Sequence, residues 1–236
     1  LTFSIKLLNS FGFDSIEADL STRPEKSIGN SDDWEKATNS LKSALENQNI
    51  SYVTAHGEGA FYGPKIDLHV KDAIGRRWQL STIQVDFAQP DNFDLQFVDS
   101  NNKRVKPVMI HRALLGSIER FTGILIENYA GEFPGWLSPV QVKILTIGDV
   151  SNYVNKITKS IKGFRYEVDD RNLRLGEKLH DASKDRVPIT LIVGEKDELS
   201  NTLAINIRSQ ENQQNVKYED AIKQIKANLK TPIFKI

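Results

Sequence analysis

The stretch PVMIHRALLGSIERF, residues 107–121, decides the fold expected for the first half of the chain. Apolar residues over 105–110 predict a short buried strand, and His111 stands where that strand ends. The strand is followed by apolar residues at helical spacing, which predict a helix: Leu114, Ile118, Phe121, Leu125 and Tyr129.

Gly116 lies within this predicted helix, where a glycine costs about 1 kcal/mol relative to alanine. A helix face of small residues, with Arg120 at its edge, lets a flat ligand or a sheet approach closely. A histidine at a strand end and an arginine on the next helix outline an active site. An ordinary core helix with one glycine explains the pattern equally well, so the pattern alone leaves both interpretations open.

The composition is that of a soluble globular protein. The chain has 236 residues, enough for one large domain or two ordinary ones, with 39% hydrophobic and 26% charged residues. It has no apolar run long enough to span a membrane and no visible secretory leader. Cysteine is absent, which excludes disulfides and thiolate metal ligands from this chain. The first residue is Leu1 rather than methionine, which suggests a fragment.

The two halves of the chain differ in charge although the total is zero. Residues 138–236 hold 17 basic and 13 acidic residues, a balance of +4, and the remainder has the opposite balance. A mildly basic C-terminal half is compatible with a nucleic-acid partner, but it lacks the dense basic patch that would prove one.

Before the central stretch, the pattern predicts alternating helices and strands. Residues 1–11 predict a helix, 13–21 a strand and 50–54 a second strand. Between the strands, Ser31 is the expected N-cap of a helix that runs to about residue 48. The glycine-rich stretch HGEGAFYGPK then allows close backbone approach to a ligand, although a plain connection between strands fits it as well.

A series of antiparallel strands is expected next. Residues 65–70 and 78–87 predict two strands joined by a hairpin turn, and 93–100 and 105–110 predict two more. Strict alternation in the second strand places Gln79 on one face, and Thr82 and Gln84 on the other. Buried amides need hydrogen-bond partners, which a polar substrate would supply. An edge strand with solvated amides is the alternative.

Beyond Pro139 the pattern changes to regular alternation of strands and helices, with a polar surface turn expected at residues 209–215. We therefore predict an α/β protein with two domains, residues 1–137 and 138–236. The first has an antiparallel sheet with helices packed on it, and the second is a small α/β domain with a mixed sheet.

Three stretches resemble the threonyl-tRNA synthetases, a class II family. MIHRALLGSIERF resembles motif 3 of that family, and the stretches LSTRPEKSIG (residues 20–29) and HGEGAFYGPKID (residues 56–67) also match it in order and spacing. The likeness extends over the whole chain, which is similar to the C-terminal half of such an enzyme. Class II synthetases for proline, histidine or glycine share the C-terminal domain, but the motif 3 wording and His111 favour threonine.

The resemblance implies residue roles for a synthetase that condenses threonine with ATP and then transfers threonyl to tRNA. Arg120 and Lys65 are implied as catalytic residues, and the ATP contacts are Lys65, Gln79, Thr82, Ser117 and Arg120. Tyr62 and Gln84 are implied to bind threonine. His111 is implied as one of three protein ligands of a zinc ion that binds the amino acid, and Mg²⁺ accompanies ATP.

The family pattern also has parts that this chain does not contain. Two further zinc ligands, a cysteine and a histidine, and motifs 1 and 2 precede the matched region in the family. One ligand does not hold zinc on its own. We therefore expect that the chain by itself neither activates threonine nor binds zinc tightly.

In the C-terminal domain, the resemblance implies anticodon contacts from Asp149, Arg171, Asn172 and Asp197, whereas Asn206 stands where the family often has arginine. The implied partners are tRNA(Thr), ATP and threonine, in a cytoplasmic homodimer. A non-catalytic RNA-binding or regulatory relative of a class II synthetase is the alternative function. Such a relative could have lost Arg120, Lys65 or Gln79, and all three are present.

Overall fold

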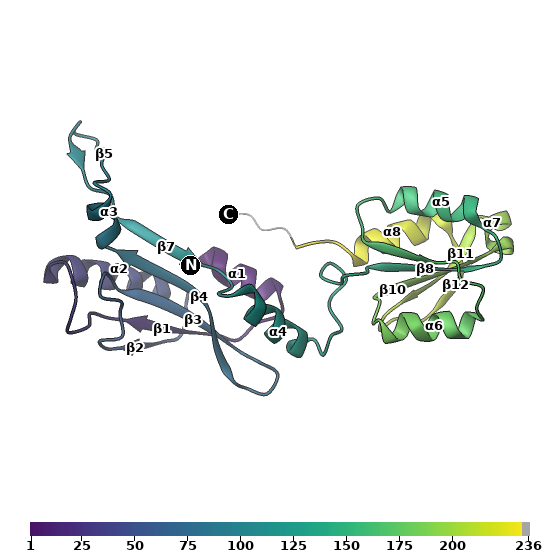
Figure 1. Cartoon of the computed structure of the whole chain (residues 1–236), viewed down its shortest axis with the longest axis horizontal. Helices are drawn as coiled ribbons and strands as arrows, with labels where there is room; N and C mark the ends of the chain where they lie inside the picture. Colours follow the sequence, from purple (N-terminus) through teal and green to yellow (C-terminus); the bar gives the residue numbers. More distant parts are fainter. Residues whose placement is uncertain (233–236) are drawn as a thin grey trace. The chain divides into compact units, whose positions relative to one another are not determined.

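The computed structural model describes residues 1–232, which form two compact units that divide after Asn128 (Figure 1). None of the helices within these residues has the length and apolarity to cross a membrane. The expected two-part α/β organisation is present, with one sheet of five strands in each unit.

The first unit is built on a sheet with the strand order β2-β1-β3-β4-β7. The strands are β1 (Ile16–Ser21), β2 (Tyr52–Ala55), β3 (Lys65–Lys71), β4 (Arg77–Asp86) and β7 (Met109–Ala113). The helices are α1 (Thr2–Ser10), α2 (Ser31–Asn47), the short α3 (Ala88–Asn92) and α4 (Ile118–Asn128).

The sheet is antiparallel except for its outermost pair, because β1 and β2 are parallel. The antiparallel sheet that we expected is therefore present, with one parallel pair at this edge. The helix α2 lies between β1 and β2 in the chain, and a helical crossover returns the chain in the same direction.

One face of the sheet is apolar and belongs to the core. Ala18, Leu20, Ile66, Leu68 and Leu80 are all buried there. The helices α1, α2 and α4 supply the other large buried apolar side chains of this unit: Leu8, Trp34, Leu41, Leu45, Phe121, Ile124 and Leu125. The opposite face is polar and carries the candidate active site.

A β-bulge in β4 overturns the predicted facing of Gln79. Leu68 lies opposite Ser81 but the next residue, His69, lies opposite Gln79, so Leu80 is an extra residue. Gln79 consequently shares a face with Thr82, and its Nε2 lies 2.9 Å from Thr82 Oγ1. Strict period-two alternation cannot reveal a bulge, because the inserted residue reverses the facing of everything before it.

Gly116 is not inside a helix, which corrects a central expectation. The helix α4 begins at Ile118, and Gly116 precedes it with a φ of +64°. A Cβ at this position would lie 3.2 Å from the Leu80 carbonyl oxygen of β4. Close approach to a sheet is thus the reason for the glycine, but it occurs in a loop with left-handed backbone. Leu114 and Tyr129 lie outside the helix.

The strand that carries His111 is an exposed edge strand and not a buried one. His111 lies in the middle of β7, and Ile110 beside it is 61% exposed. The expected strand at 105–110 is split, because Arg104–Val105 form β6, which pairs with the short β5 (Phe97–Val98) in a separate hairpin. An apolar run does not tell an internal strand from an edge strand.

Two smaller expectations are also corrected. The N-cap of α2 is Asn30, whose side chain accepts a hydrogen bond of 2.8 Å from the Asp33 backbone N–H, and not Ser31. The strand expected at 93–100 is mostly irregular, with α3 before it and only two residues in β5.

The second unit has a mixed sheet in the order β12-β11-β10-β8-β9. Its strands are β8 (Val142–Ile147), β9 (Tyr166–Asp169), β10 (Ile189–Gly194), β11 (Thr202–Ile207) and β12 (Gln213–Lys217). Its helices are α5 (Ser151–Ser160), α6 (Leu175–Lys184), α7 (Glu195–Ser200) and α8 (Tyr218–Asn228). The surface turn expected at 209–215 thus gives way to β12 from Gln213 onward.

The sheet of the second unit lies between two layers of helices, with α5 and α8 on one face and α6 on the other (Figure 1). Strands β8, β9 and β10 are parallel, and β11 and β12 complete the sheet in antiparallel order. The centre of the core is formed by fully buried side chains of β8 and β10: Val142, Ile144, Ile189, Leu191 and Val193.

The segment that precedes β8 is fastened to the second unit by two arginines. Arg165 donates to the carbonyl oxygens of Trp136 and Ser138, and Arg208 donates to those of Glu132 and Phe133. These residues therefore pack with the second unit, whose contacts begin at Tyr129. The functional boundary between residues 137 and 138 stays a prediction.

We predict that Gly63→Ala destabilises the first unit by about 3 kcal/mol, because an added Cβ would lie 1.9 Å from the Val85 carbonyl oxygen and force the backbone apart. Gly123→Ala, in the open middle of α4, should instead stabilise it by about 1 kcal/mol. Thermal unfolding of both variants measures the effect. Equal melting temperatures for Gly63→Ala and the unaltered chain would show that the loop has room to shift.

Candidate active site and nucleic-acid interface

The polar face of the first sheet carries a row of side chains across β3, β4 and β7. In the strand register, Lys65 lies opposite Gln84, Asp67 opposite Thr82, and Gln84 opposite His111. Paired residues point to the same face of a sheet, so this row is a single surface. The strands shown in Figure 1 thereby bring together residues that are far apart in the sequence.

Asp67 is the centre of this row. It is 5% exposed, and its carboxylate lies 2.7 Å from Lys65 Nζ, 2.5 Å from Gln79 Nε2 and 2.7 Å from Thr82 Oγ1. One buried carboxylate therefore orients three of the five side chains that the resemblance assigned to ATP. We did not single out Asp67 from the sequence, although its place between Lys65 and His69 on the polar face of a predicted strand was a usable signal.

The remaining predicted residues of the row form two pairs. Tyr62 donates its hydroxyl to Gln84 Oε1 at 3.2 Å, and His111 Nε2 lies 2.7 Å from Asp86 Oδ2. The imidazole itself is 48% exposed, whereas the Asp86 side chain is buried. The carboxylate therefore fixes the orientation of a histidine whose other ring nitrogen is left for a ligand.

Asp86 remains ionised because it collects several hydrogen bonds. Burial opposes ionisation, but hydrogen bonds from the backbone N–H of Gln89, from His111 and from the backbone N–H of Ala88 hold its pKa below the usual value. Asp86 lies within the strand predicted at residues 78–87, but we did not single it out from the sequence.

Arg120 and His111 lie at opposite ends of the row. Arg120 Nη2 donates to the Gln79 carbonyl oxygen at 2.6 Å, and Ser117 Oγ accepts from the Arg120 backbone N–H at 3.2 Å. His111 is opposite Gln84, five residues further along β4. At about 3.3 Å per residue, the two are joined by a surface roughly 16 Å long.

The β3–β4 hairpin connects this face to α4. The fully buried carboxylate of Asp72 accepts from Trp78 Nε1 at 2.8 Å and from Arg76 Nε at 2.5 Å. Arg76 also contacts Glu127 of α4 at 2.9 Å. Burial opposes ionisation, but hydrogen bonds from Trp78 and Arg76 lower the pKa of Asp72 to about 2. This network holds the helix that carries Arg120 against the sheet.

His69 is a further member of the polar face, where it lies opposite Gln79. Burial, together with the positive charge of Arg77, lowers the pKa of His69. Its Nε2 lies 3.7 Å from Asp19, which is also held by Arg77 at 2.6 Å. His69 is therefore a mainly neutral packing residue near neutral pH.

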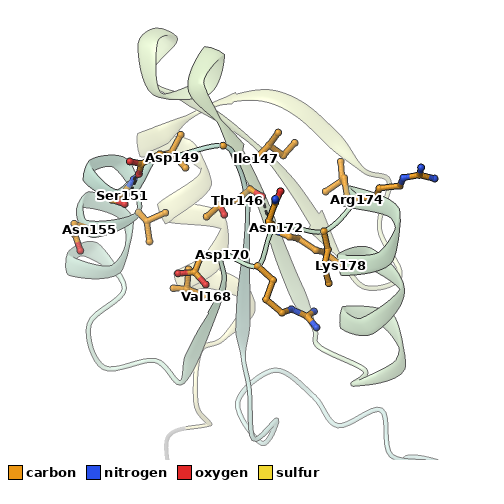
Figure 2. A pocket seen from close by; sticks show the side chains of 16 residues that line it. Thr146, Ile147, Asp149, Ser151, Asn155, Val168, Asp170, Asn172, Arg174 and Lys178 are labelled. Carbon is orange, nitrogen blue, oxygen red and sulfur yellow. Dashed lines mark hydrogen bonds between the residues drawn. The ribbon is translucent and has the colours of Figure 1, made fainter.

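The second unit has a groove of about 750 Å³ at the carboxyl ends of β8 and β9 (Figure 2). The loops that follow β8 and β9 lead to helices on opposite faces of the sheet, α5 and α6, so a crevice opens where these two strands end. Ligands of open α/β sheets bind in that position. Asp149, Arg171 and Asn172, which we predicted as anticodon contacts, all line the groove.

The charged groups of the groove are held in place. Asp149 accepts hydrogen bonds from the Oγ and backbone N–H of Ser151, which lower its pKa. Arg171 binds the carboxylates of Asp169 and Asp181 at 2.6 and 2.7 Å, and these contacts raise its pKa. Its Nε and Nη2 are therefore engaged by protein carboxylates.

Asp197 and Asn206 do not line the groove. Asp197 accepts from the Gly194 backbone N–H at 3.0 Å and caps α7, and Asn206 lies on β11 by a separate hollow. The sequence missed three apolar side chains that are partly exposed at the carboxyl ends of β8 and β9, Ile147, Val168 and Leu173. They provide flat apolar surface of the kind on which a base can rest.

Comparison with known proteins settles the family. Residues 6–129 match the tRNA synthetase class II core domain (G, H, P, S and T), and residues 141–228 match the anticodon binding domain. The chain belongs to the class II tRNA synthetases. The groove of the second unit lies within the part that matches an anticodon binding domain.

Individual relatives agree with the resemblance seen in the sequence. The chain is 50% identical over 213 residues to the threonine--tRNA ligase of Clostridium tetani, covering 87% of this chain and 33% of the relative. It is 46% identical to that of Aquifex aeolicus, covering 98% and 36%. The chain thus spans about a third of the length of these relatives. The resemblance to threonyl-tRNA synthetases is confirmed.

Solved structures confirm the fold. The RNA binding domain of threonyl-tRNA synthetase from Cryptosporidium parvum Iowa II superposes with a TM-score of 0.89 at 30% identity, covering 98% of this chain and 59% of that one. A putative threonyl-tRNA synthetase from Aeropyrum pernix gives 0.72 at 26% identity, covering 98% and 60%. The predicted class II sheet followed by a small α/β domain is therefore correct.

We predict that Asp72→Asn lowers the stability of this synthetase chain at pH 7, and that the difference from the unaltered chain shrinks as the pH falls from 4 to 2. The folded-state pKa of about 2 lies below the ordinary value of about 3.9, so the stabilisation is present above pH 4 and lost on acidification. Denaturant unfolding followed by tryptophan fluorescence measures it, with the exposed Asp14→Asn as control. A difference that does not change with pH would contradict the assignment.

Proposed function

We propose that the chain serves in a threonine–tRNA ligase, where it supplies part of the ATP and threonine site and the domain that reads the anticodon. In that reaction threonine and ATP form threonyl-adenylate and pyrophosphate, and threonyl then passes to tRNA(Thr). The observation that carries the proposal is the row on the polar sheet face, with the Asp67 cluster and Arg120 at one end and His111 at the other.

The cluster around Asp67 suits a nucleotide. Because Gln79 directs its Nε2 at Asp67 and Thr82, its amide oxygen is left as an acceptor for a ribose hydroxyl or a base amino group. Lys65 and Arg120 supply positive charge for the phosphates, and Ser117 lies one turn before Arg120. When the threonine carboxylate attacks the α-phosphorus, these cations stabilise charge on the phosphoryl oxygens, and fixed positions supply most of the rate.

The other end of the row suits the amino acid. Tyr62 and Gln84 hold one another, so each presents a defined polar group to a small substrate. His111, fixed by Asp86 and half exposed, fits the role of one zinc ligand. Among residues 1–232, no group of three histidines or carboxylates could hold a metal, so the other donors have to lie outside this set.

When bound, such a zinc ion would supply a Lewis acid that takes the amino and hydroxyl groups of threonine. A site built for a hydroxyl discriminates strongly against an analogue that lacks it, which would exclude valine. Mg²⁺ accompanying ATP, a homodimer and a cytoplasmic location follow from the same assignment and stay predictions.

The groove of the second unit is the proposed site for the anticodon. It combines apolar surface at Ile147 and Leu173 with polar groups from Asp149, Asn172 and Asp170. Unstacked bases of a loop need this combination of a surface to rest on and groups that recognise their edges.

The alternative is an RNA-binding relative without catalysis. Only the groove would then have a ligand, and no requirement would preserve the cluster around Asp67. The complete hydrogen-bonded set of Lys65, Gln79 and Thr82 favours the ligase, and the two experiments below separate the two functions.

We predict that ATP with Mg²⁺ shifts the amide NMR signals of β3, β4 and residues 116–120 in the 236-residue chain, because the phosphates contact Lys65 and Arg120. Arg120→Ala should weaken ATP binding at least ten-fold, as expected for a charge-assisted contact of about 1.5–3 kcal/mol. Titration of ¹⁵N-labelled protein measures both.

The matched control is Arg104→Ala, an exposed arginine on β6, which should leave ATP binding unchanged. Shifts confined to other strands, or equal losses from the two variants, would contradict the ATP site. An unresponsive sheet face in a chain that still binds RNA would favour the non-catalytic relative.

We predict that the chain binds a stem-loop with a threonine anticodon at least ten-fold more tightly than one with an unrelated anticodon. Asn172→Ala should remove most of this preference, because a base-edge contact is worth about 1–3 kcal/mol in discrimination. Fluorescence anisotropy measures the dissociation constants, with Asn212→Ala, outside the groove, as control. Equal affinity for the two RNAs would contradict anticodon reading by this chain.

A further inference from the structure

Lys178 of α6 is a charged side chain buried beneath the groove of the second unit. The residue is 2% exposed, and Figure 2 shows it among the side chains that line the groove. Its ammonium donates to the carbonyl oxygen of Thr146 at 2.8 Å and to that of Asp169 at 3.0 Å. It thus bridges the carboxyl ends of β8 and β9, where the two strands open into the groove.

An ammonium has three N–H donors, and two of those of Lys178 are used. The nearest carboxylate oxygen, Asp169 Oδ1, is 4.0 Å away, beyond hydrogen-bond distance. That carboxylate is engaged by Arg171 at 2.9 and 2.6 Å. Among the described residues, the third N–H of Lys178 therefore has no recorded acceptor.

The buried carboxylate of Asp169 balances the charge of Lys178 at 4.0 Å, but it does not accept the third N–H, so an acceptor from a ligand would satisfy that donor. The acceptor has to enter through the groove, because Lys178 lines its floor. Two carboxylates, Asp149 and Asp170, also line the groove, beside the cations Arg171 and Arg174. The carboxylates suit a neutral ring that carries N–H donors beside a carbonyl oxygen.

We infer that Lys178 is a specificity-determining residue, which donates its third N–H to a carbonyl oxygen of a base inserted into the groove. Guanine and uracil carry such an oxygen next to a ring N–H, whereas adenine and cytosine present an amino group at the corresponding position. The groove then accepts the first two bases and rejects the others, because two donors facing each other leave a buried ammonium unsatisfied. The inference rests on the proposed binding of an RNA loop in this groove.

The test replaces single atoms of the RNA. The guanine and the uracil of a threonine-anticodon stem-loop are exchanged one at a time for 6-thioguanine and 4-thiouracil, which keep the ring N–H but offer sulfur, a weaker acceptor. Binding to the full chain is measured by fluorescence anisotropy. Only one of the two bases contacts Lys178, so one of the two exchanges should weaken binding to the unaltered chain about ten-fold. This is the size expected for a hydrogen bond to a charged group.

The same exchange should change binding to Lys178→Met less than two-fold, because the donor is gone. Lys223→Met, which removes one exposed lysine outside the groove, should respond like the unaltered chain. An equal loss in Lys178→Met and the unaltered chain, or no loss in either, would overturn the assignment of Lys178.

If Lys178→Met does not fold, the ammonium can be observed in the unaltered chain by ¹⁵Nζ NMR of its lysines. A buried, slowly exchanging signal should shift on addition of the stem-loop and shift less with the thio-substituted base; an unmoved signal would refute the contact. If no stem-loop binds the chain at all, the proposed function fails. If only the assignment of Lys178 fails, the stem-loop still binds, and the thio exchange does not change its affinity.

Discussion

The Asp67 carboxylate is the interaction on which the first unit's site depends. It is nearly inaccessible to water and is held at hydrogen-bond distance by Lys65, Gln79 and Thr82. Each of these side chains could adopt several conformations without it, and shared acceptance by one buried group removes that freedom. In the proposed ligase, positioning supplies most of the rate of an in-line displacement, and this cluster is already organised before substrate arrives.

The β-bulge at Leu80 is the backbone feature that makes this cluster possible. With regular alternation, Gln79 would point into the apolar core, where its amide would lack partners. The extra residue turns Gln79 to the polar face and leaves its carbonyl oxygen to receive Arg120. Gly116 then allows the loop before α4 to approach the same strand. The bulge and the glycine together place Arg120 of α4 beside the row of polar side chains on β4.

The groove of the second unit forms in a different way. Parallel strands end at a common edge, and the loops after β8 and β9 lead to α5 and α6 on opposite faces of the sheet, which leaves a groove between them. Lys178 closes the floor by binding strand-end carbonyl oxygens that would otherwise face the groove. Arg171, predicted as a base contact, also binds Asp169 and Asp181, and these contacts stabilise the loop that carries Asn172.

The sequence by itself determined the two-part architecture, the family and nearly all members of the polar row. Motif residues and apolar periodicity depend only on the order of neighbouring residues in the chain. The sequence did not show that His111 lies on an exposed edge strand, that Gly116 precedes its helix, or that Gln79 faces Thr82. Those features depend on which strands become neighbours and on one inserted residue. Asp67, Asp86 and Lys178 were overlooked for the same reason, since the partners that give a buried charge its role come from distant parts of the chain and meet only in the folded protein.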